Sequence, residues 1–334
     1  MLAGRDAPPW PGRAGQLALR AHLRDLDDLH LGSGSHPGGV VWSAVCACVG
    51  GASVREALAA ASFGYELTVR LAEALAPERA RWHSTAVAGV VGAAGAAAKL
   101  LATDAVDAVA HAVSVAGGSS WALVERTGTR LLHRAHAASS GVACARIGLP
   151  ASRGALESGR GAFAALDART LLAPRAASCL EETAFRVHPA TGFAHAAIEA
   201  AQTLAPVDVD DVVRVVARVS PPAAVALASN PAPTTDDERW WSIEHAVADA
   251  LGSAELCDRV ELAAGGDGWG ASVEVTLRDG AVRSAAVDRP RPASDDDLRL
   301  KWRRLTGDDG AAFFERLASA SDDARFAQLV DLLP

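Results

Sequence analysis

Residues 84–102 read STAVAGVVGAAGAAAKLLA, and this stretch decides the class of fold. It is apolar on nearly every side of a helix, which is typical of a helix that packs against several neighbours. Its many glycines and alanines let those neighbours approach closely. A membrane span needs about 20 predominantly apolar residues, but the small side chains and Lys99 favour a close-packed core helix. We therefore expect a central buried helix and no membrane contact.

The sequence around this helix also has a helical pattern. Residues 53–75, SVREALAAASFGYELTVRLAEAL, place apolar side chains at spacings of three and four. Residues 104–118, DAVDAVAHAVSVAGG, do the same. The pattern continues to about residue 182, so we predict a large all-helical domain over residues 1–182.

The pattern changes after residue 182. Residues 270–288, GASVEVTLRDGAVRSAAVD, alternate apolar and polar side chains about an Asp-Gly turn, which indicates a β-hairpin. Residues 208–219 fit either a helix start or a strand, and residues 229–241 are typical of a loop. Ser294, followed by acids, indicates the N-cap of a final helix. We predict a mostly α protein with a smaller α+β part over residues 183–294, and a helical return to the first domain over residues 295–334.

Composition argues against several classes of function. The formal net charge is −8 and the Lys and Arg residues form no stripe, so nucleic acid is not an expected partner. The first 13 residues contain no apolar run of signal-peptide length. Five scattered cysteines are typical of free thiols in a reducing compartment, and Cys46-x-Cys48 has no second half of a zinc site. We expect a cytoplasmic protein without a metal or membrane partner.

Residues 25–39, DLDDLHLGSGSHPGG, are the first candidate site. Asp25, Asp27 and Asp28 crowd three carboxylates together, and like charges oppose one another's ionisation unless cations compensate. His36 follows a glycine-serine run and precedes a proline, so it stands outside a helix beside carboxylates, as a general base can. The alternative is a helix terminus capped by Asp25 or Asp28, with an exposed loop.

Other histidines and arginines form weaker signals. His83 precedes a helix start, with Ser84 or Thr85 as a possible N-cap, and a purely structural histidine is the alternative. A cationic cluster, whose alternative is a solvated basic face, comprises Arg130, His133, Arg134 and His136. Further downstream stand Arg186 and His188 in an extended segment, His195 at a helix start, and His245 beside Glu244 in an apolar helix, where a satisfied, partly buried histidine is the alternative.

Together these segments resemble the MmgE/PrpD family, which includes 2-methylcitrate dehydratase, cis-aconitate decarboxylase and iminodisuccinate epimerase. Residues 25–39 are similar to its D-F-D-D-T-H…H-P motif, and residues 82–101, WHSTAVAGVVGAAGAAAKLL, to its H-P-T-A-V-x-G-x-x-G-A-A-A-A-A-K-L-L segment. The remaining matches follow in unbroken order toward the end of the chain. They are FGYELTVRLAEAL at 63–75, GTRLLHRAHAASSGVACARIGL at 128–149, ETAFRVHPATGFAHAAIEAA at 182–201, WWSIEHAVADAL at 240–251, VEVTLRDG at 273–280 and RPASDDDLRLKWRRLTG at 291–307.

The resemblance implies a fold and a class of chemistry. The fold is a large all-helical domain plus an α+β lid domain, in a homodimer, with no metal or organic cofactor. The implied function is a lyase of dehydratase or decarboxylase type that acts on a small carboxylated substrate through an enolate-like intermediate. Alternatives are an epimerase or double-bond isomerase with the same proton abstraction, or a non-catalytic binding protein.

By the same resemblance, Asp25, His36 and His83 are the expected catalytic residues. Asp25 would orient or tune a histidine, and His36 and His83 would move protons. The expected substrate-binding residues are Arg130, His133, Arg186, His195 and His245, with the two arginines as a carboxylate clamp.

The chain departs from the family pattern at several positions. Leu29 stands where the family has threonine, and His245 where it has tyrosine, so two hydroxyl groups are missing. Arginine replaces lysine at 130 and 186, alanine replaces cysteine at 190, and glutamate replaces proline at 244. These departures leave a cationic site but predict a short, diverged member with a different substrate.

Overall fold

The computed structural model describes residues 9–23, 25–75, 81–124, 128–154, 174–227 and 229–330. The chain divides into two compact units. The first, the helical unit, comprises Met1–Leu23, Asp27–Phe185 and Ala293–Pro334, and the second, the α+β unit, comprises Arg24–Leu26 and Arg186–Pro292. The expected division lay at residues 182/183 and 294/295, within three residues of these two boundaries, but it did not include the short segment at 24–26.

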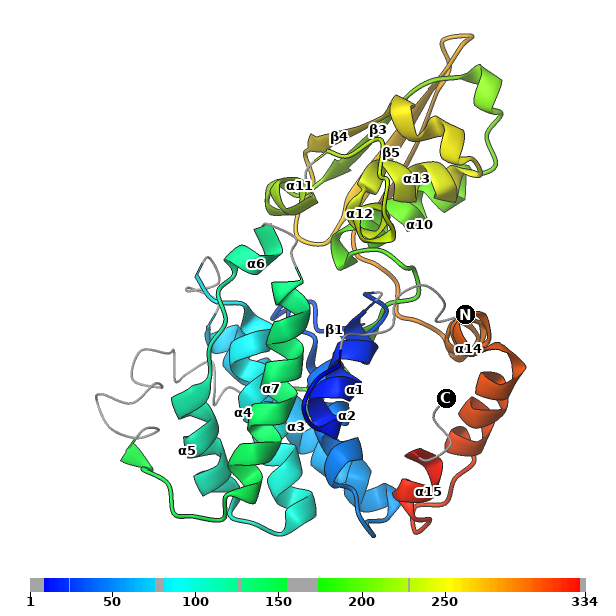
Figure 1. Ribbon diagram of the computed structural model, residues 1–334. Coiled ribbons are helices and arrows are strands. Elements are labelled where there is room, and N and C mark those ends of the chain that lie inside the picture. The colour runs from blue at the N-terminus through cyan, green and yellow to red at the C-terminus, as the bar shows by residue number, and fades with distance from the viewer. Residues whose placement is uncertain are drawn as a thin grey trace. The chain divides into compact units, whose positions relative to one another are not determined.

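The helical unit is built around α4, Ser84–Leu101. Helices α2, α3, α5 and α7 all pack against it, as Figure 1 shows. Fourteen of its residues are buried, nearly all of them alanine, glycine or valine. The helices around it are α1 (Arg13–His22), α2 (Pro37–Cys48), α3 (Val54–Ala74), α5 (Ala105–Val115), α6 (Trp121–Val124) and α7 (Thr129–Arg146).

Glycine at two positions sets how closely these helices approach α4. A Cβ on Gly92 would lie 1.8 Å from Thr68 Oγ1 and 2.6 Å from the Gly64 carbonyl oxygen of α3. A Cβ on Gly141 of α7 would lie 2.5 Å from the Ala93 Cβ. Among the described residues, α4 is the one helix long and apolar enough to cross a membrane, and 78% of it is buried within the protein. The predicted core helix is therefore confirmed.

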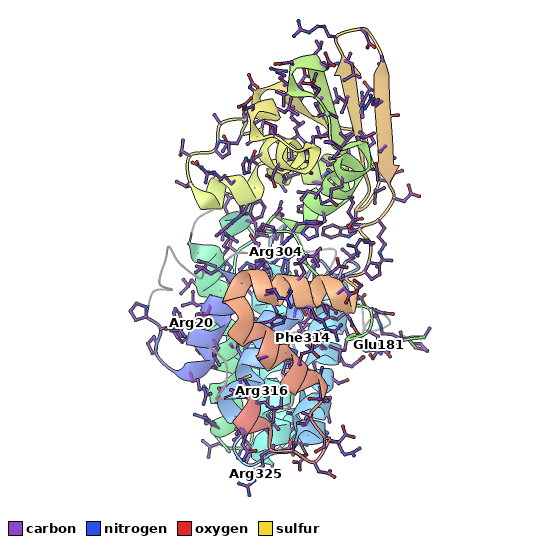
Figure 2. The ribbon with its side chains drawn as sticks, turned by 90° about the vertical axis from the view of Figure 1, so that its right-hand side faces the viewer. Arg20, Glu181, Arg304, Phe314, Arg316 and Arg325 are labelled. Carbon is purple, nitrogen blue, oxygen red and sulfur yellow. The ribbon has the colours of Figure 1, made fainter. Side chains whose placement is uncertain are left out.

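The C-terminal segment returns to the helical unit. Ser294 and Asp297 form a capping box at the start of α14, Asp295–Ala318, as the sequence predicts. The helix bends at Gly307, which has a positive φ of 71° that glycine adopts without the strain of a side chain. Arg299, before the bend, donates from Nε to Glu315 beyond it at 2.8 Å and lies over the ring of Phe314, which Figure 2 labels.

The final described helix, α15 (Phe326–Val330), is joined to the start of α3. The Phe326 N–H donates to the Ala52 carbonyl at 3.0 Å, and the Val54 N–H donates to the Ala324 carbonyl at 2.8 Å. Arg325, labelled in Figure 2, pairs with Ser53 in a β-bridge. The tail is thus held on the helical unit by backbone hydrogen bonds at its far end.

The α+β unit is a four-stranded sheet in the order β4-β3-β5-β6, with helices α10 and α13 packed on it (Figure 1). The strands are β3 (Val212–Val219), β4 (Val260–Ala264), β5 (Ala271–Leu277) and β6 (Val282–Val287). Strand β4 runs parallel to β3, and the other pairs are antiparallel. The helices are α10 (His195–Leu204), α11 (Pro221–Leu227), α12 (Asp236–Trp241) and α13 (Ile243–Leu251), with 3-10 turns at Gly192–Ala194, Val209–Asp211 and Ala254–Arg259.

The structure of the α+β unit confirms one sequence prediction, decides a second that was left open, and corrects a third. Strands β5 and β6 form the predicted hairpin, and residues 212–219 are a strand after a 3-10 turn. The predicted loop over residues 229–241 is wrong in its second half, because Thr235 and Glu238 form a capping box that starts α12.

Candidate functional site

His36 is held at the start of α2 by backbone contacts. It is the N-cap residue, with Pro37 as the first helical residue. Its N–H donates to Thr85 Oγ1 at 3.0 Å, and its Nδ1 donates to the Asp28 carbonyl oxygen at 2.6 Å. Because a carbonyl oxygen cannot donate, Nδ1 carries a proton, and in the neutral imidazole the lone pair is therefore on Nε2. The His36 side chain is 15% exposed, so the alternative of an exposed loop is wrong here.

Asp28 has a structural position beside this histidine. Its carboxylate accepts from the Gly38 N–H in the first turn of α2, at 2.9 and 3.0 Å. The Tyr65 hydroxyl of α3 donates to the same carboxylate at 2.7 Å. Burial raises the pKa of Asp28 from 3.8 to about 6, although both hydrogen bonds lower it. The predicted capping role for an aspartate is thus found at Asp28, for the helix that follows it.

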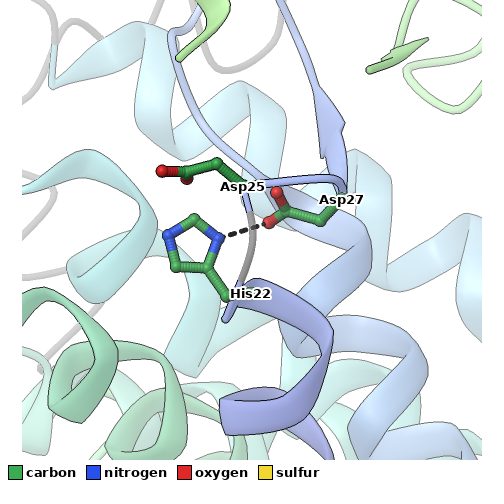
Figure 3. A group of neighbouring side chains, drawn as sticks. All are labelled: His22, Asp25 and Asp27. Atoms are coloured by element: carbon green, nitrogen blue, oxygen red, sulfur yellow. Dashed lines mark hydrogen bonds and ion pairs between the residues drawn. The ribbon is translucent and has the colours of Figure 1, made fainter. Parts of the chain in front are cut away.

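Asp27 contacts the histidines of the helical unit. Its Oδ2 lies 2.9 Å from Nδ1 of His22, the last residue of α1, as Figure 3 shows. Its Oδ1 lies 3.9 Å from His36 Nδ1, and the two imidazole rings are 5.6 Å apart. Sequence reasoning missed His22, whose signal was its place just before the acidic cluster. The role expected of Asp25, to orient a histidine, stays a prediction.

His83 and His133 form a second histidine pair. Their Nδ1 atoms lie 2.9 Å apart, so one nitrogen donates and the other accepts. His83 is 3% exposed and is itself the N-cap of α4, without a capping bond from its side chain. The prediction of Ser84 or Thr85 as N-cap is therefore wrong. Thr85 instead accepts from the His36 N–H.

The cationic cluster of α7 is partly buried rather than solvated. Arg130 and Arg134, one helical turn apart, are 4% and 1% exposed, so a solvated basic face is ruled out for them. Arg130 Nη1 lies 3.5 Å from His22 Nε2, and Arg134 Nε lies 3.9 Å from Asp27 Oδ2. Burial lowers the pKa of His83 well below 6.5, and Arg134, His133, His36 and Arg130 lower it further. Burial, with Arg134, also lowers the pKa of His133.

The α+β unit holds the remaining predicted residues. Asp25 Oδ1 lies 3.3 Å from both Nη1 and Nη2 of Arg186, and both side chains are buried. Asp25 has a φ of 52°, which aspartate tolerates better than most residues. His195 starts α10, as predicted, and its ring meets that of His188 edge-on at 5.3 Å. Burial, with His188 and Arg186, lowers the pKa of His195 to about 3.

His245 also belongs to the α+β unit. It is in the first turn of α13, as predicted, with its N–H bonded to Ser242 Oγ at 3.0 Å. The neighbouring Glu244 is fully buried and accepts from Ser229 Oγ at 2.6 Å and the Asn230 N–H at 3.2 Å. The glutamate that replaces the family proline therefore anchors the loop before α12.

The MmgE/PrpD N-terminal domain matches residues 14–175. This match supports membership of the MmgE/PrpD family. A search of curated proteins finds no significant match. The family includes 2-methylcitrate dehydratase-type enzymes, which indicates an enzyme of dehydratase or lyase type.

The part of the chain that matches the MmgE/PrpD N-terminal domain contains His22, Asp27, His36, the histidine pair and the two α7 arginines. Arg186, His195 and His245 lie beyond the match. His22 and Asp27 carry atoms that can ligate a metal, but the adjacent guanidinium groups favour an anion at this place. A surface cavity lined by Thr103, Asp104, His111 and Leu149 holds none of the predicted site residues.

Proposed function

We propose that this MmgE/PrpD protein is a lyase of dehydratase or decarboxylase type that acts on a small carboxylated substrate through an enolate-like anion. The observation that supports it is the buried cluster of the helical unit. The imidazole of His83 is neutral and can exchange protons. The buried guanidinium groups of Arg130 and Arg134 lie close enough to lower its pKa. An anionic intermediate needs such cations, and its formation needs a base.

The charges of the cluster suit substrate binding and proton transfer together. Burial lowers the pKa of His83 most, and the charges of Arg134 and Arg130 lower it further. A bound carboxylate would offset that effect, because an opposite charge favours the protonated imidazole. His83 would then bind a proton more readily while substrate is present, as its proposed role as proton donor requires.

For dehydration, the proposed steps balance as follows. A histidine Nε2 lone pair takes the proton from the carbon beside the carboxylate, and the C–H electron pair moves into an enolate-like carboxylate held by arginine. The electrons return to form the C=C bond while the β-hydroxyl leaves. The other histidine donates a proton to that hydroxyl, which departs as water. His36 and His83 are the proposed base and acid, with His133 as the proton partner of His83. Asp25, Arg186, His195 and His245 remain proposed site residues of the α+β unit.

Deuterium incorporation in heavy water, followed by proton NMR, tests this function. The purified protein is incubated with 2-methylcitrate, cis-aconitate, iminodisuccinate and a series of 2- and 3-hydroxycarboxylates. Loss or gain of water, or release of CO2, from at least one of them is the expected result. A sample treated with a chelator should behave identically, because the family resemblance implies no metal.

The other outcomes separate the competing functions. Exchange of the α-proton or inversion of the carbon centre, without loss of water or CO2, would point to an epimerase or isomerase. Absence of exchange with every carboxylate, despite measurable binding, would favour a non-catalytic binding protein and contradict the lyase.

A further inference from the structure

We propose that Asp27, His22 and Arg130 form a buried chain in which a neutral His22 positions the guanidinium group that binds the substrate carboxylate. His22 is a positioning residue in this proposal, since it acts through Arg130. The part of the proposal that concerns substrate rests on the proposed function. The chain of hydrogen bonds itself does not.

Hydrogen-bonding capacity determines the protonation of His22. A carboxylate accepts only, so Nδ1 must donate to Asp27 Oδ2 across the 2.9 Å contact shown in Figure 3. A guanidinium donates only, so Nε2 must accept from Arg130 Nη1 across 3.5 Å. One form of imidazole satisfies both contacts: the neutral tautomer with its proton on Nδ1.

All three side chains of the Asp27–His22–Arg130 chain are buried, so the hydrogen bonds between them affect the energy of the folded site. His22 is 2% exposed, the Asp27 side chain 4% and Arg130 4%, so solvent offers little compensation for a broken contact. A long arginine side chain loses rotamer freedom when it is fixed. The bridge through His22 removes that freedom before substrate arrives, which is the physical basis of preorganisation.

Asp27 also lies at the centre of the cluster. The same carboxylate is 3.9 Å from Arg134 Nε and 3.9 Å from His36 Nδ1. Its charge therefore acts on the second arginine and on the proposed base, and one substitution should disturb both. Asp28, the next residue, provides a matched control, because its carboxylate faces Tyr65 and the Gly38 N–H instead.

Histidine tautomers can be measured without any activity. In protein labelled with 15N histidine, at pH 7.5 and without ligand, long-range proton–nitrogen spectra should show His22 as neutral with the proton on Nδ1. Asp27→Asn should shift His22 toward a mixture of tautomers, and Asp28→Asn should leave its signals in place. A wild-type His22 that is charged, or has its proton on Nε2, would overturn the chain.

Substitutions of His22 test its positioning role, with citrate as the binding probe. His22→Gln can still donate to Asp27 and accept from Arg130, and we expect citrate affinity within about threefold of the wild type. His22→Leu can do neither and should weaken binding by at least about tenfold, the lower end for a lost charge-assisted contact. Equal affinity in folded Gln and Leu variants would contradict the positioning role.

The two arms separate failure of this proposal from failure of the proposed function. The expected tautomer with no citrate binding by the wild type would support the Asp27–His22–Arg130 chain and count against the carboxylate-binding function. On a substrate found in the lyase assay, His22→Leu should raise KM more than it lowers kcat. A fall in kcat of about 100-fold in both Gln and Leu variants would instead make His22 a proton-transfer residue and overturn the proposal.

Discussion

His83 Nδ1 lies 2.9 Å from His133 Nδ1, and this contact joins α4 to α7 through a single shared proton. The two residues differ in burial, since His83 is 3% exposed and His133 is half-buried. Burial and neighbouring cations lower both pKa values, which favours the neutral form of each ring near neutral pH. The pair can therefore pass a proton between the buried cluster and a less buried ring.

Removal of His83 should abolish most of the turnover. We expect His83→Ala to lower kcat by about 100-fold or more, which is the usual scale of general acid–base catalysis, with little change in substrate affinity. His133→Ala should cause a smaller loss that added imidazole partly restores. Steady-state kinetics measure both, after circular dichroism has shown that each variant is folded. Near-normal turnover of folded His83→Ala would contradict its assignment as acid or base.

The two buried arginines of α7 should control substrate binding. Replacing Arg130 or Arg134 by alanine should weaken binding by about one to two decades, since one charge-assisted hydrogen bond contributes roughly 1.5–3 kcal/mol. Lysine at either position should restore part of the affinity, because it keeps the charge but not the guanidinium fork. Calorimetric titration with citrate and with the lyase substrate gives the affinities. Unchanged affinity in both alanine variants would remove them from the site.

Asp28 should make stability depend on pH. Its folded pKa of about 6 lies above its ordinary value of 3.8, so its stabilising contribution is present below pH 3.8 and is lost as pH rises through 6. Asp28→Asn keeps an acceptor for the Gly38 N–H and a partner for Tyr65 but has no charge. The variant should gain stability relative to the wild type between pH 4.5 and 7.5, by about 2–3 kcal/mol at most. Urea unfolding at the two pH values gives the difference, and a gain that does not depend on pH would contradict the prediction.

Local patterns in the sequence predicted most of the fold. Three predicted features depend only on neighbours in sequence, and the structure contains each of them. They are the helix over residues 84–102 that is apolar on nearly every side, the Asp279–Gly280 turn and the Ser294 N-cap. The Thr235 cap was equally local and was overlooked. The docking of α15 beside Ser53 depends on contacts between distant segments, which periodicity does not report.

The site was less predictable, for a geometric reason. Three aspartates within four residues point to different partners: Asp25 to Arg186, Asp27 to His22 and Asp28 to Gly38. The left-handed φ of Asp25 and the burial of the whole segment decide these directions, and neither is visible in composition. Buried arginines pose the same difficulty, because a charge run in sequence usually indicates a solvated face.

Gly92 tests whether close helix packing fixes the core that carries the site. An added Cβ would lie 1.8 Å from Thr68 Oγ1 and 2.6 Å from the Gly64 carbonyl, so the backbone of α3 or α4 must shift. Overpacking of a core costs about 1–3 kcal/mol, and the higher helix propensity of alanine offsets about 1 kcal/mol of that at most. We expect Gly92→Ala to lower the unfolding free energy in urea and the Tm. Gly51→Ala is the matched control, because nothing lies within 4 Å of its added Cβ, and its stability should stay close to that of the wild type. A Gly92→Ala variant as stable as Gly51→Ala would mean that the α3–α4 crossing is looser than these distances indicate.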